Sequence, residues 1–212
     1  MKSLNTLFFA RCLLVCLGVL SMNSVSHARI GESAQTIERR IYSNGGIKYR
    51  DDAILSNRKK TIPYLKFMDY MPSGSKVSVF FKTHDGRKPK SSDMEEGGML
   101  AGWDLHVLYV NGKSALELYK RSQAISEFEF NQLLVLQSGS GWQKIKAGPR
   151  VEGEEPPVSA LGFTMVTNDG TIRASKVGGD AVMFFRADLD ILLAETKLQS
   201  QQESAPTSVM GF

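Results

Sequence analysis

Apolar positions near the start of the chain follow a helical spacing. Ala34, Ile37 and Ile41 recur at intervals that place them on one face of a helix, with polar residues between them. Ser33 precedes this face and can accept a hydrogen bond from a free backbone N–H at the helix start. Asn44-Gly45-Gly46 follows with residues that tolerate positive φ, so we expect a short helix that ends there.

Alternating patterns later in the chain predict two β-hairpins. Residues 104–121 are centred on Asn111-Gly112, a dipeptide that favours a type I′ turn because both residues accept positive φ. Both faces of the strand before this turn carry apolar residues, which is typical of a central strand. Residues 158–177 surround a second turn at Asn168-Asp169-Gly170, and residues 180–185 add a further apolar strand.

The stretch between these hairpins carries a complete set of helix start signals. Ser126 is the expected N-cap and Glu129 its capping-box partner, because each side chain can satisfy a backbone N–H of the other residue. Ile125 and Phe130 can pack together across the cap as a hydrophobic staple. Ser138-Gly139-Ser140-Gly141 predicts the end of this helix.

Shorter patterns predict the remaining elements. Residues 64–71 and 76–83 flank the turn signal Pro72-Ser73-Gly74-Ser75, which predicts a third hairpin. Residues 84–102 form a long polar connection of a kind that is functional or mobile. Residues 189–197 favour a last helix because their leucines share one face.

Together these elements predict a single α+β domain over residues 29–197. Its core is a single antiparallel sheet of hairpins, with two or three helices packed mainly on one face. Trp142 is expected to anchor the helix that precedes it against this sheet. Residues 198–212 are rich in Gln, Ser and Pro, and we expect them to form a disordered C-terminal tail.

The first 28 residues have the pattern of a cleavable secretory signal peptide. Lys2 and Arg11 make a positive start, and residues 12–22 are apolar but too few to span a bilayer of about 30 Å as a helix. Ser26-His27-Ala28 ends the segment with small residues where cleavage requires them. We therefore expect export to the periplasm or the medium, with no transmembrane span in the mature chain.

Cleavage after Ala28 changes the composition of the folded chain. Both cysteines, Cys12 and Cys16, leave with the signal peptide, so the mature chain can form neither a disulfide nor a thiolate zinc site. Lys2 and Arg11 leave as well, which removes two of the 26 basic residues while all 22 acidic ones remain. A nucleic-acid binder normally carries a larger, clustered basic excess, so we expect no nucleic-acid partner.

Several short motifs resemble a group of small, uncharacterised exported bacterial proteins. The residues that carry the resemblance are Arg29-Ile30-Gly31-Glu32-Ser33, Tyr109-Val110-Asn111-Gly112-Lys113, Tyr119, Glu129, Leu133, Leu134, Trp142, Asp169-Gly170 and Ala174. The resemblance implies export and an α+β fold. It implies no catalytic residues, because none are known for the group.

Few residues of the mature chain could carry chemistry. His84 lies beside Asp85-Gly86, which predicts a turn, and residues 93–96 are a run of acids and methionine typical of a solvated segment, so we expect no metal site. No phosphate-binding glycine loop is present, and we expect no cofactor. Gly139-Ser140-Gly141 lacks the pattern of a serine-hydrolase elbow, and the catalytic residues, if there are any, are unknown from the sequence.

Two basic clusters could contact anionic lipid or an anionic envelope polymer. They are Arg58-Lys59-Lys60 and the group Lys82, Arg87, Lys88 and Lys90. The alternative interpretation is that both are ordinary solvated loops whose charges nearby acids balance.

The sequence favours a non-enzymatic exported protein that binds or scaffolds another component of the cell envelope. This hypothesis depends on the missing nucleophile, metal set and cofactor loop. The alternative is a small extracytoplasmic hydrolase whose site combines His106 with acids that are distant in sequence.

Overall fold

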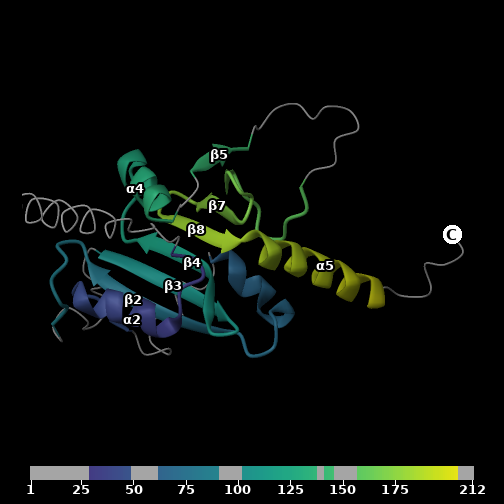
Figure 1. The fold of residues 1–212 in the computed structure, drawn as a ribbon, viewed down its shortest axis with the longest axis horizontal. Helices are drawn as coiled ribbons and strands as arrows, with labels where there is room; N and C mark the ends of the chain where they lie inside the picture. The colour runs from purple at the N-terminus through teal and green to yellow at the C-terminus, as the bar shows by residue number, and fades with distance from the viewer. Residues whose placement is uncertain (1–28, 49–61, 91–101, 138–140, 146–156, 205–212) are drawn as a thin grey trace, which may run out of the picture.

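A single antiparallel sheet forms the body of the protein. The computed structural model describes residues 29–48, 62–90, 102–137, 141–145 and 157–204. Eight strands of these residues pair in the order β1-β2-β3-β4-β8-β7-β6-β5 (Figure 1). The expected signal peptide, the cluster Arg58-Lys59-Lys60, the acidic run at 93–96 and the helix stop at 138–140 lie outside the described residues.

The described chain contains four helices besides the strands. In chain order the elements are α2 (Ala34–Ser43), β1 (Ile47–Lys48), the 3₁₀ helix η2 (Pro63–Tyr70), β2 (Lys76–Thr83), β3 (Gly102–Val110), β4 (Lys113–Arg121), α4 (Glu127–Gln137), β5 (Trp142–Lys144), β6 (Met165–Thr167), β7 (Ile172–Val177), β8 (Ala181–Arg186) and α5 (Ala187–Glu203). The α+β class expected from the sequence is therefore confirmed.

Two of the three predicted hairpins form. β3 and β4 pair antiparallel across Asn111 and Gly112, whose φ angles of 52° and 75° are those a type I′ turn requires. β6 and β7 pair across the turn that contains Gly170, at φ 74°. β6 begins only at Met165, so the first strand of this second hairpin is shorter than the sequence pattern indicates.

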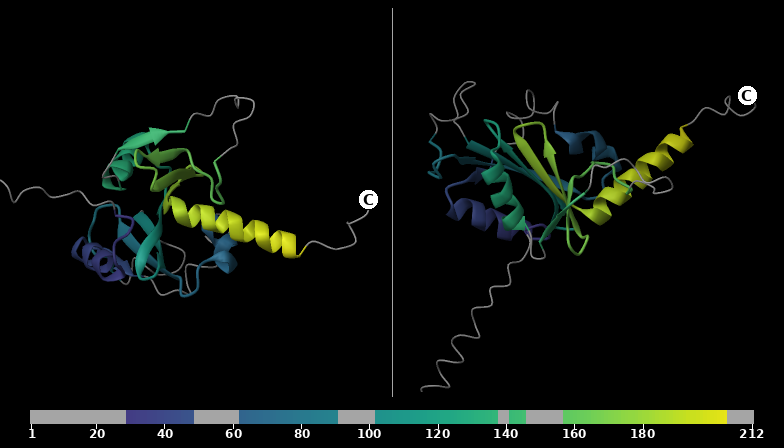
Figure 2. Two further views of the ribbon diagram at one scale, coloured as in Figure 1. Left: turned by 45° about the vertical axis from the view of Figure 1, so that its right-hand side comes forward. Right: turned by 90° about the horizontal axis from the view of Figure 1, so that it is seen from above.

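Helices cover both faces of the sheet, and the expectation that they pack mainly on one face is wrong. α2 and α4 share one apolar cluster with one face, and η2 and α5 share a second cluster with the other face. Figure 2 shows the two pairs on opposite sides. The reason lies in β8, where Val182 and Phe184 enter the first cluster while Met183 and Phe185 enter the second. A strand that is apolar at consecutive positions needs cover on both faces.

The segment expected to form a third hairpin with β2 is a 3₁₀ helix instead. Pro63 occupies the first turn of η2, where a missing N–H costs nothing. Tyr64 and Phe67 lie three residues apart and therefore on one side of a 3₁₀ helix, and both are buried. The aromatic content suggested a strand, but the three-residue spacing fits this tighter helix.

The start of α4 has the predicted cap. Ser126 N–H donates to Glu129 Oε2 over 2.9 Å, and Glu129 N–H donates to Ser126 Oγ over 3.2 Å. Ile125 and Phe130 both join the cluster beneath this helix. Trp142 Nε1 donates to the carbonyl of Leu134 over 2.8 Å, which ties the end of α4 to β5 as expected.

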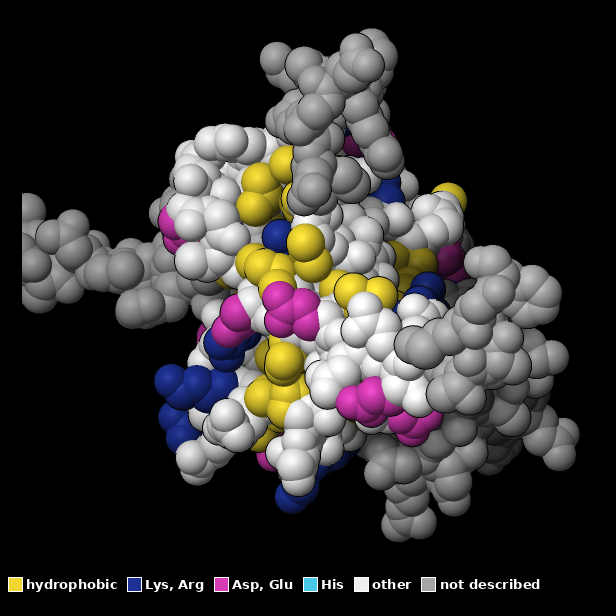
Figure 3. All heavy atoms as spheres, turned by 90° about the vertical axis from the view of Figure 1, so that its right-hand side faces the viewer, with side chains coloured by type: hydrophobic (Ala, Val, Ile, Leu, Met, Phe, Trp, Pro, Cys, Tyr) yellow, Lys and Arg dark blue, Asp and Glu magenta, His cyan; other side chains and the backbone are white. Residues whose placement is uncertain are grey.

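The last helix is longer than the sequence pattern indicates. α5 continues to Glu203, so residues 198–203, which we expected in a disordered tail, are helical. Its C-terminal part extends away from the sheet (Figure 1). Figure 3 views the side toward which α5 points, where hydrophobic side chains form a broken band between acidic and basic groups. Leu192 and Leu198 of α5 are exposed at 42% and 56%, which is ordinary for single apolar residues on a surface.

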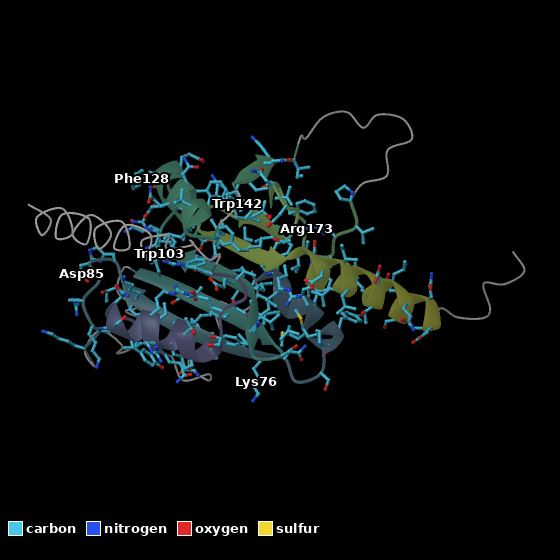
Figure 4. The ribbon with its side chains drawn as sticks, viewed as in Figure 1. Lys76, Asp85, Trp103, Phe128, Trp142 and Arg173 are labelled. Carbon is cyan, nitrogen blue, oxygen red and sulfur yellow. The ribbon has the colours of Figure 1, made fainter. Side chains whose placement is uncertain are left out.

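A buried ion pair fixes the segment before β6. Arg173 Nη1 of β7 lies 2.6 Å from Asp190 Oδ2 of α5, and the Asp190 side chain is 0% exposed. Asp190 also accepts hydrogen bonds from the hydroxyl of Ser159 and the backbone N–H groups of Ala160 and Leu161. Figure 4 shows Arg173 at the centre of this region, between the sheet and α5.

No helix within the described ranges is both long enough and apolar enough to cross a membrane.

Candidate ligand-binding site

Two rows of side chains on one face of the sheet form the floor of a cleft. The strand register pairs Phe80 with Leu105 and Leu105 with Tyr119, so these three side chains lie in one row across β2, β3 and β4. The next row holds Lys82 beside Trp103. Because alternate residues of a strand point to the same face, both rows face the layer of α2 and α4.

The two helices of this layer form the walls. Ile41 and Asn44 of α2 line the cleft, as do Leu133 and Leu136 of α4. Arg29, which precedes α2, also lines it. The cleft has a volume of about 340 Å³, at the lower end of the roughly 300–1,000 Å³ typical of small-molecule sites.

The lining of the cleft is cationic. It includes Arg29, Arg40 and Lys82, and none of the described residues that line it is acidic. Arg40 Nη2 donates to Glu32 Oε2 over 2.5 Å at the edge of α2. The Nε atom of Arg40 is buried and has no hydrogen-bond partner among the described residues, whereas buried donors in proteins are nearly always paired. An oxygen atom of a bound ligand could supply the partner.

A buried polar network lies next to the cleft floor. Tyr119 Oη donates to Glu117 Oε2 over 2.6 Å, and Gln137 Nε2 donates to the same oxygen over 2.7 Å. Gln137 Oε1 in turn accepts the backbone N–H of Ile30 over 3.2 Å. The network therefore joins β4, the end of α4 and the start of the described chain.

Burial dominates the protonation of this network. Desolvation raises the pKa of Glu117 above its ordinary value, although the hydrogen bonds from Tyr119 and Gln137 and the charges of Arg40 and Arg29 act in the opposite direction. Desolvation and the neighbouring Glu117 also raise the pKa of Tyr119. Tyr119 therefore stays a neutral phenol, and Glu117 holds its proton to a higher pH than an exposed glutamate does.

His84 and His106 are not part of the cleft. His106 is 3% exposed and forms a hydrogen bond through Nδ1 with the hydroxyl of Tyr64, at 2.9 Å. Tyr64 belongs to the apolar cluster on the opposite face of the sheet from the cleft. His84 lies at the surface after β2. The hydrolase site that the alternative hypothesis built on His106 therefore does not lie at this cleft.

The residues that the sequence suggested for a metal site or a basic patch do not form one site in the structure. Among the ranges that the structure describes, no three His, Cys, Asp or Glu side chains are grouped so that they could hold a metal ion. Of the second basic cluster, Lys82 lines the cleft, while Arg87 forms an ion pair with Asp85 at 3.2 Å and Lys88 and Lys90 are exposed. This cluster is therefore divided between the cleft and an ordinary surface turn.

The sequence did not indicate that the residues lining the cleft converge. The hydrophobic pattern of residues 34–41 places Arg40 only on the polar side of its helix. Glu117 offered a usable signal, because a glutamate between two leucines in a central strand must be buried with partners. The convergence of Arg29 and Trp103 had no such signal, since residues so far apart in sequence meet only through the sheet register.

Comparison of the chain with protein-family models, with curated proteins and with solved structures finds no match.

Proposed function

We propose that this chain is an exported, non-enzymatic binding protein of the cell envelope and that its ligand occupies the cleft between α2 and α4. The observation that carries the proposal is the lining of this cleft, in which an apolar, aromatic floor meets three cationic side chains and no acidic one among the described residues. Such a combination of apolar surface with a few converging polar groups is typical of ligand sites.

Export is supported by the first 28 residues and by the cysteine count. Residues 1–28 have the charge, the length and the small-residue ending of a cleavable signal peptide. Cleavage after Ala28 would leave a cysteine-free chain that is held by packing alone. The two large apolar clusters, one on each face of the sheet, supply such packing.

Binding without turnover is supported by the chemistry of the lining. The side chains at the cleft supply charge, apolar contact and a tyrosine hydroxyl that already donates to Glu117. A hydrolase needs a nucleophile or a base within hydrogen-bond reach of its substrate. His106, the base suggested for the alternative hydrolase, packs against Tyr64 on the other face.

A pair of tryptophan substitutions on α4 tests the proposal. Leu136 lines the cleft, whereas Val135 is 66% exposed and does not, so Leu136→Trp fills the cleft while Val135→Trp adds the same bulk outside it. Protein that begins at Arg29 is incubated with a small-molecule extract of the cell envelope and examined by native mass spectrometry.

We expect wild-type protein and Val135→Trp to retain a bound compound that Leu136→Trp loses. Retention by all three proteins, or by none, would remove the cleft as the ligand site. A compound released in chemically altered form would instead favour the hydrolase.

A further inference from the structure

We infer that the ligand of the cleft is a small amphiphile with a single apolar chain and an anionic oxygen head, held by the guanidinium groups of Arg29 and Arg40. The inference rests on the proposed function and specifies its ligand class. It combines three independent features of the cleft: its charge, its unsatisfied donor and its apolar floor.

The two arginines converge at one part of the cleft. Both lie close enough to Glu117 to influence its charge, and Arg29 also lies close enough to the Tyr119 hydroxyl to lower its pKa. Arg40 reaches this point from α2, and Arg29 reaches it from the segment before that helix. Paired guanidinium groups suit a carboxylate or a phosphate, because their planar donors match the spacing of the oxygen atoms.

One donor at this point lacks a partner. Arg40 Nη2 donates a hydrogen bond to Glu32, but the buried Nε of Arg40 has no acceptor within the described residues. Leaving a buried donor unpaired costs free energy, so an acceptor oxygen bound here would recover part of that cost. An anionic head is the ligand chemistry that meets both the charge and this donor.

The rest of the cleft suits an apolar chain. Phe80, Leu105 and Leu133 are 1%, 5% and 8% exposed and present ring and aliphatic carbon along the floor and one wall. Trp103 continues this surface in the next row of the sheet. The volume of about 340 Å³ favours one short chain over a lipid with two long chains.

The neighbouring carboxylates do not cancel the attraction for an anion. Glu32 is bonded to Arg40, and Glu117, which lies beside Tyr119 on the same face of the sheet, is 0% exposed. Burial raises the pKa of Glu117, which reduces the negative charge close to the arginines. Arg29 and Lys82 then act on the ligand alongside Arg40.

Trp103 provides a direct signal for the test. The chain has two tryptophans, so the Trp142→Phe variant leaves Trp103 as the source of tryptophan fluorescence. Figure 4 shows Trp103 at one end of the sheet and Trp142 beside α4. Four probes with the same chain length are titrated: decanoate, decyl phosphate, decanol and decyltrimethylammonium, each below its micelle concentration.

We expect one or both anions to shift the emission of Trp103 and to bind at least about ten-fold more tightly than decanol, with the cation weakest. Preference for decanoate would identify a carboxylate head, and preference for decyl phosphate a phosphate head. Equal binding of decanol and the anions, or binding of none of the four, would overturn the inference.

A matched pair of arginine substitutions assigns the head group. Arg40→Gln should weaken the anions about ten-fold and leave decanol unchanged, because a neutral amide keeps hydrogen bonding but loses the charge. Arg39→Gln, on the exposed side of the same helix, should change neither. Arg29→Gln is the second test if Arg40→Gln lowers the melting temperature.

The binding site and the class of its ligand are tested separately. If Val135→Trp retains an envelope compound and Leu136→Trp loses it while the anions show no advantage, the ligand class is wrong and the cleft remains the binding site. If Leu136→Trp binds both the extract compound and decanoate as wild type does, the site itself is wrong.

Discussion

At the scale of the residue, Glu117 is the most consequential single group. It is fully buried beside the cleft, and its Oε2 accepts from Tyr119 and Gln137. Burial raises its pKa against the opposing influence of Arg40 and Arg29. The protonation of Glu117 therefore makes the stability of the fold depend on pH. It also changes the net charge beside the cleft that a ligand meets.

Glu117→Gln should remove a pH-dependent loss of stability. A carboxyl group whose pKa is higher in the folded state favours folding below its unfolded pKa, which is near 4.5, and loses that contribution as pH rises through the folded value. The difference in free energy of unfolding between Glu117→Gln and wild type should therefore grow in favour of the variant as pH rises above about 4.5.

Urea denaturation across this pH range measures the effect. Glu127→Gln is the control, because the Glu127 side chain is 78% exposed and its ion pair with Lys176 is a surface pair of small energy. A constant difference for Glu117→Gln would show that its carboxyl group titrates alike in both states.

Asp190→Ala should destabilise the protein by about 3–5 kcal/mol, because it leaves Arg173 buried without its counter-charge. Asp188→Ala, two residues earlier in α5, removes an exposed ion pair with Arg186 and a hydrogen bond from the N–H of Leu189, and should cost about 1 kcal/mol. Denaturant unfolding compares the two variants. Similar losses for both would mean that the buried pair is not the stronger interaction.

At the scale of the element, the structure shows which predictions local sequence can support. The turn at Asn111-Gly112 and the start of α4 were predictable because their hydrogen bonds join residues close in sequence. η2 was not, since aromatic content fits a strand and a 3₁₀ helix equally and only the three-residue spacing separates them. Contacts between residues distant in sequence decide which face of the sheet each helix covers. The same kind of contact forms the cleft, so local sequence predicts neither.

Ser126→Ala should cost about 1 kcal/mol of stability, because it removes the acceptor for the N–H of Glu129 at the start of α4. Gln132→Ala, at an exposed position in the same helix, should change stability by less than about 0.5 kcal/mol. Thermal unfolding followed by circular dichroism measures both. Equal melting temperatures for the two variants would contradict a stabilising role for the cap.

At the scale of the whole molecule, the proposed processing and the proposed site meet at Arg29. Arg29 lines the cleft, and cleavage after Ala28 would place a new α-ammonium group on this residue. Export would then add one positive charge beside the ligand head. The proposed signal peptide and the proposed binding function would be linked by a single covalent step.

Protein that begins at Arg29 should bind decanoate several-fold more tightly than protein that keeps Ser26-His27-Ala28 before it, because the extension moves the α-ammonium group away from Arg29. Trp103 emission in the Trp142→Phe background measures the difference. The same tripeptide added after Phe212 is the control and should have no effect. Equal affinities with and without the N-terminal extension would show that the new terminus takes no part in binding.

The most direct test of the account is a crystal structure of the protein beginning at Arg29, grown with decanoate. We predict a single ligand between α2 and α4, with its carboxylate about 3 Å from the guanidinium nitrogens of Arg40 and its chain against Phe80 and Leu105. An empty cleft with decanoate bound elsewhere, or a carboxylate turned away from Arg40, would contradict it.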